Sequence, residues 1–485
     1  MKKSLLLWAL LGGTVPFAAS LIIAGCGGSG GPLKPPDTGG NGGGTSSAFL
    51  QLLPAAQKDA TYVGSDICRT CHETGASGAP VVDYAKWEAT RHSQLGIGCE
   101  QCHGPGSVHA AGPSDENILS YPNLARSEVC AQCHGPMASD FHSSPHAEVV
   151  EDVVGSATPS KTCLRCHSAP FRADYVDAPL LEGKTADEVD AAIQALSADK
   201  VAAFAAASKE SASCVNCHSA MRDTPYLSWG TGKQYHLLRE ETLLDTSALA
   251  AGTPVKTYST INQMCGACHN NRGGGSNDAT LTSSTVRPTF HHGPQFPMLM
   301  GVGGCEEGGS PPPVRTTAHA SAPGQCVRCH MPDAKHTMVV NFDKSCAPCH
   351  TPGDAAARYA IRGAIEARLV ALLTRLQNWS KATFGDPDLW NYTSYIPTGK
   401  TAPNQSLIPI QVKRARHNYY FVLYDKSYGV HNSTYTRYLL DLANANLDAI
   451  GVSRTAPSRL SAAQVKAILS EELRKAREYV RRETE

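Results

Sequence analysis

The sequence predicts a mainly α-helical protein of short helices and loops, with longer helices near the C-terminus and little β structure. Three observations lead to this fold class. Almost no stretch alternates apolar and polar residues as a half-buried strand does. Eight copies of a short cysteine and histidine motif lie between residues 61 and 353. After residue 354, apolar residues recur at helical spacing and the motif is absent.

Length and charge limit the classes of protein that this chain can represent. It has 485 residues, enough for two or three average domains. Lys plus Arg and Asp plus Glu both number 43, which argues against a nucleic-acid binder with its basic surplus. A mean hydropathy of −0.25 excludes a polytopic membrane protein. Aromatic residues make up only 7% of the chain, a small supply for the core of a protein this long.

The N-terminus predicts export and lipid anchoring. Lys2 and Lys3 precede an apolar stretch, and Ile23-Ala24-Gly25-Cys26 resembles a bacterial lipobox. We expect a lipoprotein signal peptide over residues 1–25 and a lipid on Cys26; an ordinary secretory peptide with a chance cysteine is the alternative. The next residue is not the Asp that retains many lipoproteins at the inner membrane, which favours the outer membrane. The face of that membrane stays open.

A Gly- and Pro-rich stretch follows Cys26, and it has too few apolar residues to form a core. We therefore assign residues 26–60 to the lipid anchor and a tether, and residues 61–353 to the motif domain.

The motif is Cys-x-x-Cys-His, and it uses sixteen of the 18 cysteines. This spacing is typical of covalent c-type haem attachment, in which two thiols bond to the porphyrin and the histidine binds the iron. A zinc ribbon or a disulfide framework does not require a histidine after each cysteine pair. We therefore predict eight haems, around which the short helices and loops wrap. The predicted attachment cysteines are Cys68, Cys71, Cys99, Cys102, Cys130, Cys133, Cys163, Cys166, Cys214, Cys217, Cys265, Cys268, Cys326, Cys329, Cys346 and Cys349. The predicted proximal ligands are His72, His103, His134, His167, His218, His269, His330 and His350.

Local patterns predict several helices. Thr185 and Glu188 form a capping box that begins a helix between the fourth and fifth motifs. Residues 354–378 and 409–449 have helical periodicity, and a third C-terminal helix begins at Ser461 with Gln464 three residues on. We treat 354–485 as a haem-free helical domain. The remaining cysteine, Cys305, is expected to be a free loop thiol, with a link between two chains as the alternative.

The second axial ligand of each iron decides between electron carrier and enzyme. Of the nineteen histidines, eight are proximal and eleven remain. Eleven are enough to give every one of eight haems a second histidine ligand, but the count does not show that they all do. A haem with two histidines has no open position and passes electrons only, whereas a five-coordinate haem can bind substrate.

From residue 264 to 485 the chain resembles the ammonia-forming cytochrome c nitrite reductases and their octahaem relatives, including the hydroxylamine oxidoreductases. The matching features are His319 before the seventh motif, His336 before the eighth, and a C-terminal set of Arg416, His417, Asp425, Ser427, Gly429 and His431. The resemblance implies that His319, His336 and His431 are distal ligands, and that the C-terminal domain supplies at least one of them. We add His92, His109, His146, His236 and His292 as the other expected distal ligands.

In that superfamily the fourth haem would be the catalytic one, and here several of its features are missing. Its motif ends in His167, as in the hydroxylamine oxidoreductases, and lacks the lysine ligand of the nitrite reductases. Asn270 and its neighbours replace the family's tyrosine, and no arginine lies between Ser127 and Lys161. Only His291 or His292 resembles the active-site histidine. We assign no catalytic residue.

We therefore expect an octahaem c-type cytochrome that passes electrons at the cell envelope, in extracellular respiration or metal reduction. Its expected partners are other multihaem cytochromes or redox proteins, and the membrane through Cys26; an extracellular acceptor and a homo-oligomer or filament stay open. The alternative is an octahaem oxidoreductase acting on hydroxylamine, nitrite or a sulfur oxyanion at the fourth haem. A haem-storing scaffold is a third hypothesis.

Overall fold

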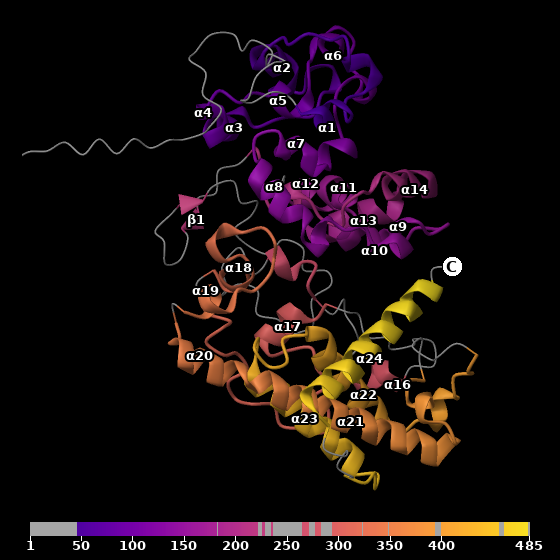
Figure 1. Ribbon diagram of the computed structural model, residues 1–485. Coiled ribbons are helices and arrows are strands. Elements are labelled where there is room, and N and C mark those ends of the chain that lie inside the picture. Colours follow the sequence, from indigo (N-terminus) through magenta and orange to yellow (C-terminus); the bar gives the residue numbers. More distant parts are fainter. Residues whose placement is uncertain are drawn as a thin grey trace, which may run out of the picture.

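The computed structural model describes residues 46–181, 183–221, 226–227, 234–235, 264–270, 277–282, 293–322, 324–347, 349–392, 399–454 and 460–483. Within these ranges the protein is built mostly from helices, and the β structure is one antiparallel pair of two-residue strands, β1 (Tyr226–Leu227) and β2 (Gln234–Tyr235). The predicted fold class is confirmed. The N-terminal half of the chain forms the upper part of the molecule and the C-terminal half the lower part (Figure 1).

Short helices dominate the upper part. They are α1 (Ser47–Leu50), α2 (Ser65–His72), α3 (Tyr84–Glu88), α4 (Arg91–Gln94), α5 (Glu100–His103), α6 (Ser107–Ala111), α7 (Ser127–Ala131), α8 (Gly135–His142), α9 (Glu151–Val154), α10 (Lys161–His167), α11 (Ala169–Arg172), α12 (Ala178–Leu181), α13 (Ala186–Ala195) and α14 (Ala198–Ala207). A π-helical turn, Ala173–Asp177, joins α11 to α12. The predicted capping box of α13 is confirmed, because the Thr185 side chain and Glu188 each accept a backbone N–H from the other.

The lower part has further short helices and then long ones. The short helices are α16 (Asp278–Thr282), α17 (Gln295–Met300), α18 (Gln325–His330), α19 (Phe342–Cys346) and α20 (Pro352–Tyr359). The long helices are α21 (Ile361–Phe384), α22 (Ile410–Asp425), α23 (Ser433–Asp448) and α24 (Ala462–Glu483). The helical stretch predicted over 409–449 is two helices, because Lys426, Tyr428 and Gly429 have positive φ and reverse the chain after α22. The predicted bond between Ser461 and Gln464 is present at the start of α24.

One continuous apolar core lies among α21, α22, α23 and α24. It is built from fully buried side chains such as Leu369, Leu376, Phe421 and Leu439. The motif region has smaller clusters, of which the largest packs Leu164, Phe171 and Val176 against α13 and α14.

The folded part of the chain begins earlier than the sequence predicts. Phe49 and Leu53 are buried against Leu119, and Gln57 donates to the carbonyl oxygens of His103 and Pro105 at 2.8 and 3.0 Å. Residues before position 60 therefore already pack against the motif region: α1 contacts α7, which holds the first cysteine of the third motif, and Gln57 reaches the second motif. The predicted signal peptide, residues 1–25, and the lipid site at Cys26 lie outside the described residues. Among the helices that are described, none combines the length and apolar character of a membrane span.

Candidate haem sites

The cysteines and the histidine of all eight Cys-x-x-Cys-His motifs fall within the described residues, and we number their sites 1 to 8 in chain order. Each motif forms about one helical turn. In sites 2, 3, 5, 6 and 8 the histidine N–H donates to the carbonyl of the first cysteine at 2.8 to 3.0 Å, the i to i+4 spacing of a helix. Each histidine therefore lies on the same side of its turn as the first cysteine. No disulfide joins the cysteines that the structure describes.

Six of the eight motif histidines have a second imidazole opposite them. The ring-centroid distances are 6.2 Å for His72 and His109 (site 1), 6.0 Å for His134 and His92 (site 3), 6.2 Å for His218 and His336 (site 5), 5.8 Å for His269 and His146 (site 6), 6.3 Å for His330 and His431 (site 7) and 6.3 Å for His350 and His319 (site 8). Each partner is one of the histidines expected as distal ligands.

This spacing has the length of an axial ligand pair. A bond from imidazole nitrogen to a transition metal is about 2 Å long, so two rings on opposite sides of one metal have centroids about 6.2 Å apart. Ordinary ring contacts cover a wider range, about 4.5 to 7 Å. Six separate pairs within 5.8 to 6.3 Å fit the narrower requirement.

Hydrogen bonds turn the paired rings so that Nε2 is left for a metal. Nδ1 donates to a backbone carbonyl in His72 (Pro80, 2.9 Å), His319 (Val430, 2.6 Å) and His330 (Met338, 3.3 Å). It donates to a side chain in His109 (Asn117, 3.0 Å), His269 (Gln295, 3.2 Å), His350 (Asp354, 2.9 Å) and His431 (Asp425, 2.6 Å). Such a bond fixes the tautomer with a lone pair on Nε2, the form that binds metals.

Burial also favours the ligand form of most of these rings. Desolvation lowers the pKa of His92, His134, His269 and His336, and it lowers the pKa of His146 to about 4. A buried imidazole of this kind is neutral at physiological pH, as a metal ligand must be.

His431 differs from the others in the sign of its pKa shift. Burial lowers the pKa of this ring, but the charge and hydrogen bond of Asp425 outweigh burial and leave the pKa raised.

Two histidines that were not expected to be ligands form hydrogen bonds through Nε2 instead of Nδ1. Nε2 of His142 contacts the Ser127 hydroxyl at 2.7 Å, and Nε2 of His417 donates to the Gly303 carbonyl at 3.2 Å. In both rings the nitrogen that would face an iron is used within the protein. Hydrogen bonding therefore separates the paired histidines from these two.

Sites 2 and 4 differ from the other six. His103 donates through Nδ1 to the Leu119 carbonyl at 2.9 Å, and no second imidazole pairs with it within the described ranges. The expected ligands His236 and His292, and the alternative His291, lie outside those ranges. His167 of site 4 is described, and it is the last residue of α10.

Cysteines of different motifs lie close together. Hydrogen bonds join the thiols of Cys68 and Cys99, of Cys130 and Cys214, and of Cys265 and Cys326, and they raise the pKa of the first thiol in each pair. Cysteines of further sites lie close enough for the charge of one thiol to affect the pKa of another. The Cys102 thiol contributes to the raised pKa of Cys130. The site 6 thiols contribute to that of Cys217, and the site 8 thiols to that of Cys329. In site 4, the Cys166 sulfur lies 3.9 Å from the carbonyl of Ala267 in site 6.

These contacts place the attachment points in a series. Sites 1, 2, 3, 5, 6, 7 and 8 follow one another, and site 4 lies beside site 6. The described residues contain no cluster of three or more His, Cys, Asp or Glu side chains arranged to hold a metal. Each imidazole pair supplies two donors, and a porphyrin supplies the four nitrogens that complete a six-coordinate iron, so the residues fit c-type haem.

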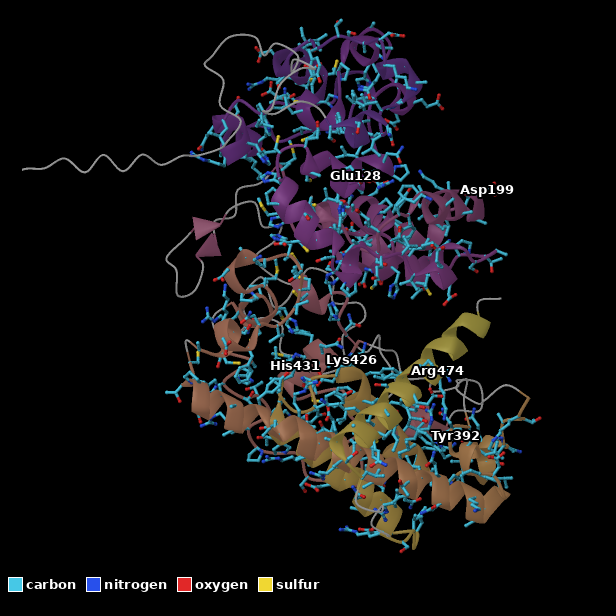
Figure 2. All side chains as sticks on the ribbon, in the orientation of Figure 1. Glu128, Asp199, Tyr392, Lys426, His431 and Arg474 are labelled. Atoms are coloured by element: carbon cyan, nitrogen blue, oxygen red, sulfur yellow. The ribbon has the colours of Figure 1, made fainter. Side chains whose placement is uncertain are left out.

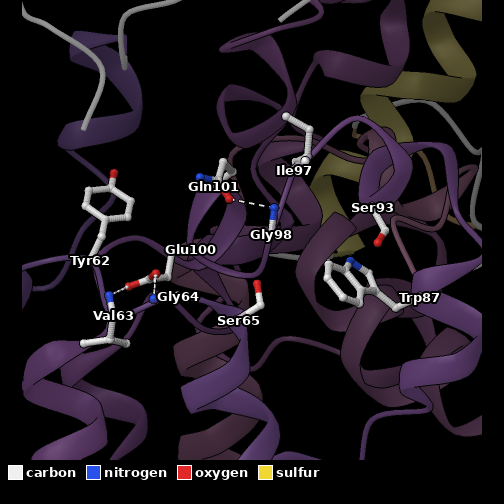
Figure 3. Close-up of a pocket in the computed structure, with 11 residues that line it drawn as sticks. Tyr62, Val63, Gly64, Ser65, Trp87, Ser93, Ile97, Gly98, Glu100 and Gln101 are labelled. Atoms are coloured by element: carbon white, nitrogen blue, oxygen red, sulfur yellow. Dashed lines mark hydrogen bonds between the residues drawn. The ribbon is translucent and has the colours of Figure 1, made fainter. Parts of the chain in front are cut away.

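A cavity of about 270 Å³ lies between sites 1 and 2 (Figure 3). It is lined by Tyr62, Val63, Gly64, Ser65, Trp87, Ser93, Gly96, Ile97, Gly98, Glu100 and Gln101. Glu100 is its one acidic lining residue, and that carboxylate accepts backbone N–H groups from Val63, Gly64 and Gly106 at 2.7 to 2.9 Å. The carboxylate therefore ties the loop before α2 to α5.

Some residues that orient the histidines were not expected from the sequence. They are Gln295 and Asp354, together with the carbonyl groups of Pro80, Met338 and Val430. Asp354 follows His350 by one helical turn in α20, a spacing that could have identified it. Every residue has a backbone carbonyl, so the sequence cannot show which ones accept these hydrogen bonds. Cys305 is a free thiol in a loop, as the sequence predicts; it is fully buried, and its backbone bonds to the Asn418 side chain at 2.7 and 2.9 Å.

Comparisons with known proteins support haem attachment. The family cytochrome c554 and c-prime matches residues 51–104, which hold the first two motifs. The C-type polyheme cytochrome OmcC of Geobacter sulfurreducens is 30% identical over 118 residues, which are 22% of this chain and 14% of that protein. OmcB of the same species is 30% identical over 112 residues, with the same two shares. The chain thus covers a small part of the relatives that it matches.

Two solved structures are also similar. They are an undecaheme cytochrome from the S-layer of Carboxydothermus ferrireducens (TM-score 0.46, 22% identity, 74% of this chain and 51% of that one) and the outer cell wall cytochrome OcwA (TM-score 0.45, 21% identity, 72% and 70%). The resemblance to the nitrite reductases and hydroxylamine oxidoreductases stays a prediction.

Each motif places two cysteines and a histidine at one turn, the matched family is a cytochrome c family, and the similar proteins of Geobacter sulfurreducens are polyheme cytochromes. These findings support a multihaem c-type cytochrome.

Proposed function

We propose that this protein holds eight c-type haems in a connected series and serves as an electron carrier of the cell envelope. The single observation that carries the proposal is the set of six imidazole pairs at 5.8 to 6.3 Å. A site with two histidine ligands has no position for a substrate.

Bound haem iron supplies a one-electron redox couple at each site. The chain's own residues fix where these couples lie and what surrounds them. The motif cysteines would fix the attachment points, and Nδ1 bonds orient seven of the twelve paired rings. Hydrogen bonds between cysteines of sites 1 and 2, 3 and 5, and 6 and 7 support neighbouring sites in a series, an arrangement expected of a carrier.

The candidates left for the distal positions of sites 2 and 4 are His236, His291 and His292, all outside the described residues, and we keep His236 and His292 as the expected pair. Six of the eight expected distal ligands each face a motif histidine. His142 and His417 use Nε2 for hydrogen bonds within the protein. His103 and His167 are the motif histidines left for the remaining two.

The envelope location rests on the N-terminal sequence and on the relatives. The lipobox-like Cys26 favours a lipoprotein of the outer membrane. One similar solved structure comes from an S-layer and another is described as an outer cell wall cytochrome. Other multihaem cytochromes are then the natural donors, and an extracellular acceptor such as a mineral surface is the expected destination.

The test combines spin state with electron uptake in the purified holoprotein. We expect eight haems by mass spectrometry, only low-spin ferric signals, and reduction of all haems by a small donor without a catalytic wave when nitrite or hydroxylamine is added. One high-spin haem that binds nitrite would contradict the carrier proposal and favour an oxidoreductase. His167→Ala and His103→Ala would then show which site is open.

A further inference from the structure

The turn between α22 and α23 contacts ligands of three consecutive sites. His431 at its end pairs with His330 of site 7. The neighbouring carbonyl of Val430 accepts Nδ1–H of His319, the partner ring of site 8, at 2.6 Å. At its start, the Tyr424 carbonyl accepts from Gln295 at 3.0 Å, and that amide in turn contacts Nδ1 of His269 in site 6 at 3.2 Å.

Asp425, at the start of this turn, holds the His431 ring through a buried carboxylate. Nδ1 of His431 lies 2.6 Å from Asp425 Oδ1, and the Asp425 side chain is 0% exposed. The other carboxylate oxygen accepts the Ser427 hydroxyl, which itself accepts the N–H of His431 at 3.1 Å. Figure 2 shows His431 and Lys426 at the upper border of the C-terminal helices.

Site 8 offers a natural comparison. His350 also donates to a carboxylate, that of Asp354 at 2.9 Å. The Asp354 side chain is 42% exposed, and its charge is shared with Arg358 at 2.8 Å. Water and a cation therefore weaken its effect on the ring, whereas Asp425 is shielded from water and its hydrogen-bonding partner besides His431 is a neutral hydroxyl.

We propose that Asp425 is a positioning residue that sets the reduction potential of site 7 at the low end of the series. This inference rests on the proposed role of His431 as the distal ligand of that site. A buried carboxylate that accepts Nδ1–H gives the ring imidazolate character and raises its basicity as a ligand. A more basic ligand and a nearby negative charge both stabilise ferric over ferrous iron, which lowers the potential.

The same bond fixes the direction of Nε2. Asp425 is the last residue of α22, a helix buried along most of its length. The carboxylate is thus anchored in the core of the C-terminal helices, and the ring that it holds faces His330 of the motif region. The proposal gives the haem-free helices a direct role in tuning a haem.

The test is a spectroelectrochemical redox titration of the holoprotein with Asp425→Asn, a substitution that keeps the size of the side chain and removes its charge. We expect one haem of the eight to move to higher potential. A tenfold change in its ferric–ferrous equilibrium corresponds to about 59 mV for a one-electron couple. The variant should stay low-spin in its electron paramagnetic resonance spectrum.

Asp333→Asn is the matched control. Asp333 follows the same motif, is 50% exposed and pairs with Lys344, so it tests the loss of one exposed charge near site 7. We expect its titration to match that of the wild type. Equal shifts in the two variants, or a titration of Asp425→Asn that superposes on the wild type, would overturn the proposal.

His431→Ala separates this failure from failure of the proposed ligation. A new high-spin signal in that variant, together with an unshifted Asp425→Asn, means that His431 is the ligand and Asp425 does not tune it. A fully low-spin spectrum in His431→Ala means that the ligand assignment itself is wrong, and it overturns both.

Discussion

The helices from residue 361 onward bury one continuous apolar core, whereas the described residues of the motif region before them form three smaller and separate clusters. The first region is held by its own side chains, such as Leu369, Phe421 and Leu439, all fully buried. In the second region, six pairs of facing imidazoles fit the ligands of haem iron. The difference indicates that one part of the chain builds its core from its own side chains, whereas under the proposed function the other would complete its core with bound haem.

The largest expected effect comes from withholding haem. In full-length chain made without haem attachment, we expect backbone amides of residues 61–353 to exchange rapidly in hydrogen–deuterium exchange mass spectrometry. Amides of α21, α22 and α23 should stay protected, because their core is made by apolar side chains alone. Equal protection of both regions, with or without haem, would contradict the contrast between them.

A core truncation in the C-terminal helices is the next largest. Leu369→Ala removes a side chain with 0% exposure, and it should lower the free energy of unfolding by about 2 to 5 kcal/mol. The matched control is Leu407→Ala, where the residue is 62% exposed and the expected change is within about 0.5 kcal/mol. Urea denaturation followed by circular dichroism measures both. Similar losses in the two variants would mean that the apolar core does not carry the stability of this region.

The two regions should also respond to pH in opposite directions. In the C-terminal helices, hydrogen bonds from Arg454 and Arg375 lower the pKa of Asp448 from its usual 3.8 to about 2. Its contribution to stability is therefore present above pH 4 and is lost as pH falls through about 2. The pair is partly exposed, so we expect about 1 kcal/mol or less. Thermal unfolding of Asp448→Asn between pH 2 and 6 should show a smaller loss in acid than the wild type, and parallel curves would refute this assignment.

The smallest effect concerns Glu210 in the motif region. Burial raises the pKa of this carboxyl, which accepts the N–H and hydroxyl of Ser127 and faces His142 at 3.6 Å. A raised pKa favours the protonated form, so its contribution is present at low pH and is lost as pH rises through the raised value. Glu210→Gln should flatten the fall in melting temperature on the alkaline side of pH 4. An unchanged pH profile would show that Glu210 stays charged in the folded protein.

The attachment cysteines and proximal histidines could be predicted because c-type haem binds to a motif of consecutive residues. Each motif supplies two thiols and one imidazole within five positions, which any fold must keep together. The distal rings are harder to assign, since His146 faces His269 and His336 faces His218 across more than a hundred residues. Counting histidines and a family resemblance gave the candidates, but the sequence could not say which ring faces which.

The fold was predictable where periodicity and caps are strong and not where the chain turns. Thr185 and Glu188 predicted the start of α13, and Ser461 with Gln464 predicted the start of α24. The reversal after Asp425 was missed, because Lys426 and Tyr428 adopt positive φ without being glycine. The glycine-rich neighbours of residues 46–60 predict a tether there, although Phe49 and Leu53 are buried in a cluster with Leu119 and Val129 of the motif region.

A structure of the holoprotein by cryo-electron microscopy or crystallography tests the central claim most directly. The account predicts an iron between the Nε2 atoms of each of the six imidazole pairs, at about 2 Å from both, with His142 and His417 away from any iron. An iron at one of these six sites bound by a residue other than its paired histidine, or left with an open position, would contradict it.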